Sequence, residues 1–166
     1  MVSVPVNLRQ FHDIIQTVMG WQNSHFFHFV ISDIVYGPKI LQEQDSSIHD
    51  FNVRLDALDL NPSAPLLYLY DFGDNWEHVI KLEQILEPDS SISCPTSLER
   101  ETPCPPADGG GPRGSANMHD IAKDPEHENY WQIIEWLGDD FDPTLFNLKQ
   151  VNRQLKRIKT NPPNKW

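Results

Sequence analysis

The chain has 166 residues, a net charge of −11, and apolar and charged fractions of 39% and 22%. This composition predicts one folded domain over residues 1–166 and excludes a globally disordered chain. No apolar run is long enough to cross a bilayer, and residues 1–6 lack the basic and apolar parts of a signal peptide. Because there are also only two cysteines, we expect a cytoplasmic protein.

The charge is distributed unevenly along the chain. Residues 1–142 hold 7 Lys or Arg and all 24 acidic residues, whereas residues 143–166 hold 6 basic residues and no acidic one. The acidic body argues against a free binder of duplex DNA. We expect the basic tail, residues 149–166, to pack against the acidic body, to be a solvated face, or to contact a nucleic acid or acidic partner. Its candidate contact residues are Lys149, Arg153, Lys156, Arg157 and Lys159.

The first part of the chain predicts a helix and then a series of strands. Asn7 and Gln10 form a capping box before apolar residues at helical spacing, and Gly20 ends this helix. Aromatic and β-branched residues between turn signals then predict two hairpins with a short strand between them. The expected strands are residues 24–31, 34–36, 52–55, 66–72 and 76–86, with a single turn at residues 58–60.

The second part of the chain predicts a long loop and then helices. Residues 88–114 contain six prolines and four glycines, and a loop of this length is functional or mobile. Ser115 is expected to cap one helix, Asp124 to begin another that Gly138 ends, and Asn147 to begin the last. Strands and helices are thus segregated, which predicts an α+β fold. It would have an N-terminal helix, an antiparallel sheet of about five strands and two or three C-terminal helices.

The turn of the second hairpin holds the densest set of reactive side chains. Residues 70–78 place three carboxylates and the imidazole of His78 around one turn, and Asp71 could approach His78 across the two strands. Such groups bind a divalent cation or act as an acid/base pair. The alternative is structural, because Asp and Asn are ordinary turn residues and His78 could be a hydrogen-bonded core histidine.

Other polar residues carry weaker signals. His25 and His28 point to opposite faces of one strand, so at most one of them joins His78. Cys104 lies in the loop without the spacing of a zinc finger, and the glycines of residues 109–115 lack the pattern of a P-loop. Tyr130, Trp131 and Trp136 stand at helical spacing, which favours core packing over a cofactor site.

Several segments together resemble the plasmid pRiA4b ORF-3-like family, which includes insertion-element passenger proteins labelled "TnpR". The resemblance covers about residues 7–155, nearly the whole chain, in the order of that family. It rests on Gly20-Trp21 and His25, on Tyr70-Asp71-Phe72-Gly73-Asp74-Asn75-Trp76-Glu77-His78, on Cys104-Pro105-Pro106-Ala107-Asp108-Gly109-Gly110-Gly111-Pro112, and on Glu135-Trp136-Leu137-Gly138 with Phe141-Asp142-Pro143.

The resemblance implies an α+β domain and no established biochemical activity. It singles out His25, Asp71, Asp74, Trp76, His78, Cys104, Asp108 and Gly110 as characteristic residues. Members usually begin with an additional strand that is missing here, shortened, or lost to a misplaced start codon, and we expect its absence to expose a sheet edge to homodimerisation. No serine–arginine recombinase site is recognisable, so the sequence does not support a resolvase.

Two functions follow as hypotheses. The first is a non-enzymatic binding or accessory module associated with plasmids or mobile elements, which binds a protein by its hairpin–loop face or a nucleic acid by its basic tail. The second is a metal-dependent enzyme, such as a hydrolase, in which Asp71, Asp74 and His78 hold a divalent metal and a bound water is the nucleophile. His25 or Asp108 would complete the metal's coordination shell. A purely structural role for Asp71, Trp76 and His78 is the third interpretation.

Overall fold

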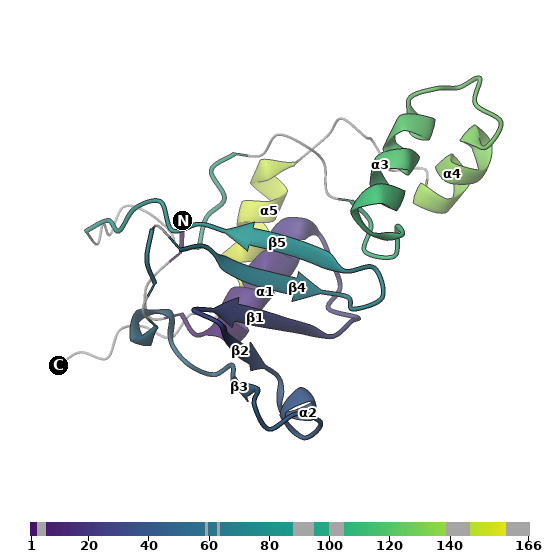
Figure 1. Cartoon of the computed structure of the whole chain (residues 1–166). Coiled ribbons are helices and arrows are strands. Elements are labelled where there is room, and N and C mark those ends of the chain that lie inside the picture. The colour runs from purple at the N-terminus through teal and green to yellow at the C-terminus, as the bar shows by residue number, and fades with distance from the viewer. Residues whose placement is uncertain are drawn as a thin grey trace.

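A computed structural model of the chain shows one mixed sheet with helices on one of its faces (Figure 1). The structure describes residues 1–2, 6–58, 60–62, 64–87, 95–99, 105–138 and 147–158. The helices and strands, in chain order, are α1 (Leu8–Met19), β1 (Phe27–Ile31), β2 (Ile34–Gly37), α2 (Lys39–Gln42), β3 (His49–Asp50), β4 (Leu66–Tyr70), β5 (Trp76–Ile80), α3 (Gly111–Ala122), α4 (Tyr130–Leu137) and α5 (Leu148–Leu155). A short 3-10 helix covers Leu55–Ala57.

The sheet has the strand order β3-β2-β1-β4-β5, and the expected α+β class and five strands are confirmed. All neighbours pair antiparallel except β3, which runs parallel to β2. The parallel pairing arises because the chain crosses over through α2 before it returns beside β2. The prediction of a short strand at residues 52–55 was wrong, because the third strand, β3, lies earlier in the chain, at His49–Asp50.

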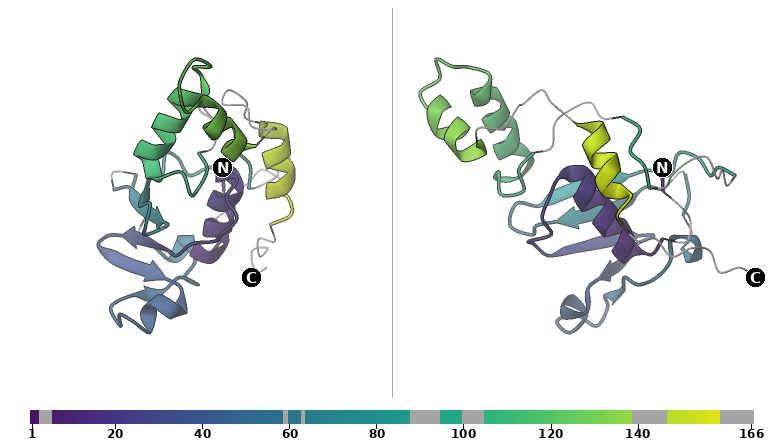
Figure 2. Two further views of the ribbon diagram at one scale, coloured as in Figure 1. Left: turned by 90° about the vertical axis from the view of Figure 1, so that its right-hand side faces the viewer. Right: turned by 180° about the vertical axis from the view of Figure 1, so that it is seen from behind.

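The core lies between the sheet and α1, with α5 beside α1 (Figure 2). Side chains of a strand point alternately to its two faces, so every second residue of β1 and β4 is buried in the core. These residues include Phe27 and Phe29 of β1 and Tyr68 and Tyr70 of β4. Asn7 and Gln10 form the expected reciprocal capping box, and Gly20 closes α1 in the left-handed conformation. Among the described residues, no helix is long and apolar enough to span a membrane.

A buried polar network joins α1 to the sheet. His12 Nδ1 lies 2.8 Å from the hydroxyl of Tyr68, and His12 Nε2 lies 2.8 Å from Oδ1 of Asn23. Gln16 donates from Nε2 to the same hydroxyl at 2.9 Å, so that hydroxyl is free to donate to His12. Burial lowers the pKa of His12 to about 4 and raises the pKa of Tyr68. Sequence periodicity placed apolar residues of this helix but did not indicate the network.

Two helix starts differ from expectation. The helix expected to follow a Ser115 cap begins instead at Gly111, with Gly110 as its N-cap and proline in its first turn. The helix expected from Asp124 begins only at Tyr130. The Asp124 carboxylate accepts from the amide of Glu126, two residues ahead, and so forms a turn in place of a helix cap.

The aromatic residues of α4 do not form the expected core cluster. Trp131 is 76% exposed and Trp136 is 50% exposed, and α4 has no buried residue. The reason is that α4 packs against α3, and the α3–α4 pair stands to the side of the sheet, beyond the β4–β5 turn (Figure 1). The spacing of Tyr130, Trp131 and Trp136 therefore predicted the helix correctly, but the prediction that these residues pack in the core was wrong.

Candidate functional site

The first part of the candidate site is the turn that joins β4 to β5. Asp71 follows β4 with φ of 57°, a left-handed conformation that is uncommon for a residue with a side chain. Its Oδ1 accepts from the amides of Gly73 at 3.0 Å and Asp74 at 3.4 Å. These bonds hold the buried carboxylate in one orientation, and its second oxygen, Oδ2, faces His25.

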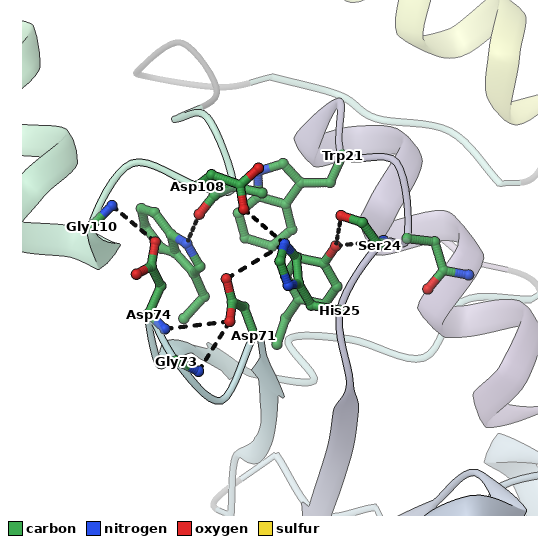
Figure 3. A network of polar contacts seen from close by, with 12 residues as sticks. Trp21, Ser24, His25, Asp71, Gly73, Asp74, Asp108 and Gly110 are labelled. Atoms are coloured by element: carbon green, nitrogen blue, oxygen red, sulfur yellow. Dashed lines mark hydrogen bonds and ion pairs between the residues drawn. The ribbon is translucent and has the colours of Figure 1, made fainter.

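His25 lies between two carboxylates that come from distant segments (Figure 3). Its Nε2 is 2.9 Å from Oδ1 of Asp108 and 3.6 Å from Oδ2 of Asp71. Within the described part of the chain, these three residues form the group whose donor atoms all lie within 4.8 Å of one another. We call His25, Asp71 and Asp108 the carboxylate–histidine cluster.

Two buried indoles hold the loop that brings Asp108 to this cluster. Trp21 donates from Nε1 to the carbonyl oxygen of Pro105 at 2.9 Å. Trp76 donates from Nε1 to the carbonyl oxygen of Ala107 at 2.8 Å. Both acceptors lie within three residues of Asp108, so the two bonds fix the backbone from which its carboxylate reaches His25. Trp76 was among the residues expected at the site from the sequence, whereas no separate role was expected for Trp21, although it lies close to His25 in the chain.

The glycine-rich segment continues this docking. Asp74 accepts at Oδ2 from the amide of Gly110 at 2.9 Å, which places a carboxylate at the N-terminus of α3. A side chain at Gly111 would overlap the carbonyl oxygen of Asp74, and one at Gly114 would overlap that of Gly109. Glycine is therefore required where α3 begins against the hairpin.

The structure brings together some of the expected site residues and separates others. Asp71 of the expected metal set belongs to the cluster, with His25 and Asp108, the residues expected to complete the coordination shell. Asp74 instead bonds to Gly110. His78 lies on the inner face of β5, where its ring contacts those of Trp21 and Tyr68 at centroid distances of 5.3 and 5.5 Å. Cys104 and Lys159 lie outside the described residues.

His28 lies on the face of the sheet away from the core. His25 does not share its strand, contrary to expectation, because β1 begins only at Phe27. Its ring contacts Phe72 at a centroid distance of 5.3 Å, and Phe72 in turn contacts Phe26 at 6.3 Å. Burial lowers the pKa of His28. Phe26 and Phe72 are about half exposed, so this aromatic group lies at the surface.

The carboxylate–histidine cluster has the chemistry of a divalent-cation site. Imidazole with two carboxylates suits transition metals such as zinc or manganese, and a neutral histidine with two carboxylates supplies two negative charges. Both carboxylates converge on Nε2 of His25, where a cation would replace the ring proton. In the absence of a cation, the same proton would link the histidine to Asp108 by a hydrogen bond.

Known proteins resemble this chain both in sequence and in fold. The family model for plasmid pRiA4b ORF-3-like proteins matches residues 1–150. Uncharacterized protein y4hQ of Sinorhizobium fredii is 36% identical over 157 residues, which cover 93% of this chain and 80% of that protein. A crystal structure of MM3350, a protein of unknown function from Methanosarcina mazei Go1, is similar with a TM-score of 0.80. The two chains are 30% identical, and the match covers 90% of this chain and 85% of the MM3350 chain.

Proposed function

This chain belongs to the plasmid pRiA4b ORF-3-like family, and we propose that it is a binding module that holds one divalent cation at His25, Asp71 and Asp108. The observation that carries the proposal is the approach of two carboxylates to the same nitrogen, Nε2 of His25. Hydrogen bonds from two indoles and from Gly110 arrange that approach before any ligand arrives. Pre-arranged donors favour cation binding because little ordering remains to be done.

The cation's role in this module is to fasten the loop to the sheet. Asp108 is carried by the loop, whereas His25 lies just before β1 and Asp71 directly after β4, so a shared ion links all three segments. The module would then present the hairpin–loop face to a partner. The family's description as a plasmid open reading frame supports an accessory role on plasmids or mobile elements.

A metal-dependent hydrolase is the second candidate. It is favoured by the openness of the cluster, since the side chain of Asp108 is 72% exposed and the described residues bring three protein donors together. Catalytic metal sites keep a position open for water, and a bound water becomes a nucleophile near neutral pH. In this case the same three residues would hold the ion and the solvent side would admit the substrate.

The test of cation binding is elemental mass spectrometry on protein purified without an affinity tag and offered zinc and manganese. We expect about one cation per chain, lost in His25→Ala and in Asp108→Asn and retained in His78→Phe. Circular dichroism checks that each variant is folded. Loss in His78→Phe with retention in His25→Ala would instead support the set Asp71, Asp74 and His78. A wild-type protein that binds neither metal would overturn the proposal.

The two candidates are then separated by hydrolysis assays on the metal-loaded protein. Turnover of a phosphodiester, phosphomonoester or ester substrate that disappears in His25→Ala would favour the hydrolase. A loaded protein without turnover, whose loop becomes more protected from hydrogen exchange on loading, would favour the binding module.

A further inference from the structure

The basic residues of α5 and of the turn that follows it form a stripe on one side of this segment. Lys149 and Arg153 stand four residues apart on one face of α5. Lys156, the C-cap of α5, and Arg157, the residue after it, continue this side beyond the end of the helix. All four are exposed. Val151 and Leu155 lie on the opposite side and are buried against the core. We call the four cations the basic stripe.

The helix that carries the stripe is firmly placed. Leu155 is 1% exposed, and α5 packs along α1. Asn152 accepts at Oδ1 from the amide of Ser97 at 2.8 Å and donates from Nδ2 to the carbonyl oxygen of Ser97 at 2.9 Å. The side chain of Thr96 adds a third bond to Asn152 at 3.2 Å. The stripe is therefore presented by a fixed backbone.

The charges of the stripe are not neutralised within the described part of the chain. None of its four cations forms an ion pair with a described acidic residue, although the whole chain carries 24 acidic residues. The basic tail was expected to pack against the acidic part of the chain, and among its described residues only the apolar side of α5 does so. Two shallow grooves of about 370 and 400 Å³ run along the stripe, and both are lined by Lys149 and Arg153.

We infer that the basic stripe is a docking surface for the phosphodiester backbone of a nucleic acid. Lys149 and Arg153 are about 6 Å apart along the helix axis, and Lys156 and Arg157 extend the row of cations past the helix end, which suits a polymer with repeated anions. Guanidinium groups bind phosphate oxygens through two parallel hydrogen bonds. Gln150 and Gln154 border the stripe with further donors.

The composition of the exposed side favours nucleic acid over an acidic protein. A protein interface has an apolar centre, whereas the exposed residues of α5 are all charged or amide side chains. Without aromatic residues for base stacking, the stripe contacts the backbone alone and reads no sequence. The net charge of −11 opposes the approach of a polyanion, so binding is weak and strongly dependent on salt.

The test measures fluorescence anisotropy of labelled mixed-sequence single strands and duplexes with the full chain at low salt. We expect Arg153→Gln/Arg157→Gln to weaken binding about tenfold or more, because two charge-assisted contacts are lost. Lys81→Gln/Lys123→Gln removes the same charge from exposed positions elsewhere and is expected to bind as the wild type does. The logarithm of the affinity should fall with the logarithm of salt with a slope of about −2 to −4, from up to four phosphate contacts.

Three outcomes would overturn the inference. Equal weakening in both double variants would show an effect of net charge alone. Equal affinity for polyglutamate would assign the stripe to acidic partners, and no binding at low salt would leave it a solvated face. Melting temperatures check that both double variants are folded, which is expected because all four substituted residues are exposed. The basic stripe shares no residue with the carboxylate–histidine cluster, so this test does not depend on the cation site.

Discussion

The indole nitrogen of Trp76 lies 2.8 Å from the carbonyl oxygen of Ala107, the residue before Asp108. One hydrogen bond thus links the first residue of β5 to the segment that delivers a carboxylate to His25. Trp76 is buried and also packs against the ring of Trp21, which holds Pro105 in the same way. The core and the candidate site are therefore connected through these two tryptophans.

Replacing Trp76 with phenylalanine tests this connection. The variant keeps an aromatic ring in the core but leaves the carbonyl of Ala107 without its donor, so we expect a loss of about 2 kcal/mol in the free energy of unfolding. Urea denaturation measures this loss, and cation titration should show a parallel loss of affinity. Trp131→Phe, at a position that is 76% exposed on α4, is the matched control. Equal stability of the two variants would contradict the role assigned to Trp76.

Two glycines with positive φ allow the cost of backbone strain to be measured separately from the cost of a steric clash with an added side chain. Gly111 has φ of 67° and no room for a side chain beside Asp74, whereas Gly138 has φ of 87° and nothing within 4 Å of an added Cβ. Gly138 also has ψ of 158°, a backbone region open essentially to glycine alone, so Gly138→Ala should cost about 2 kcal/mol from strain alone. Gly111→Ala should cost more and weaken cation binding, because α3 must move away from the hairpin. Equal effects on thermal stability and no effect on cation affinity would show that the close approach is unimportant.

Cation binding should stabilise the folded chain in a way that depends on Asp108. At a cation concentration of about 100 times the dissociation constant, linkage predicts a gain of about 2.7 kcal/mol in the free energy of unfolding. Asp108→Asn should lose most of this gain in a thermal-shift titration. Asp33→Asn removes one exposed carboxylate at the β1–β2 turn, where asparagine tolerates the same left-handed backbone, and should keep the full gain. A similar shift in both variants would point to binding elsewhere.

The buried histidine of α1 should make stability depend on pH. The pKa of His12 is about 4 in the folded chain against 6.5 for an ordinary histidine, so the unfolded chain binds the proton more tightly. The neutral form is fully favoured above pH 6.5, and stability is lost as the pH falls from about 6.5 to about 4. The total loss is about 3 kcal/mol, since each pKa unit corresponds to about 1.4 kcal/mol.

The variant His12→Gln provides the measurement. Its amide offers one acceptor and one donor but does not titrate, so its unfolding free energy should fall less steeply over this pH range than that of the wild type. The lowered pKa of His28 acts in the same direction in both proteins, and the raised pKa of Asp13 acts in the opposite direction. The difference between the two pH profiles therefore reports on His12. Profiles that run parallel from pH 7 to pH 4 would contradict the assignment.

The fold was predictable where neighbouring residues decide it. The capping box at Asn7, the turn at Ser32 and Asp33, and the alternation that turns Trp76 and His78 to one face all depend on local geometry. The start of α3 at Gly111 was missed because glycine has a low intrinsic helix propensity, and this start depends on the contact with Asp74.

The candidate site divides in the same way. The sequence by itself determined the kinds of donor, since the residues singled out by the family resemblance include His25, Asp71 and Asp108. It did not determine which donors meet, because the three residues lie 46 and 37 positions apart in the chain. Tertiary structure decided that, by docking the loop on two indoles so that Asp108 faces His25 while His78 turns toward the core. Periodicity specifies the face of a strand, whereas only long-range hydrogen bonds and packing specify which loop lies above it.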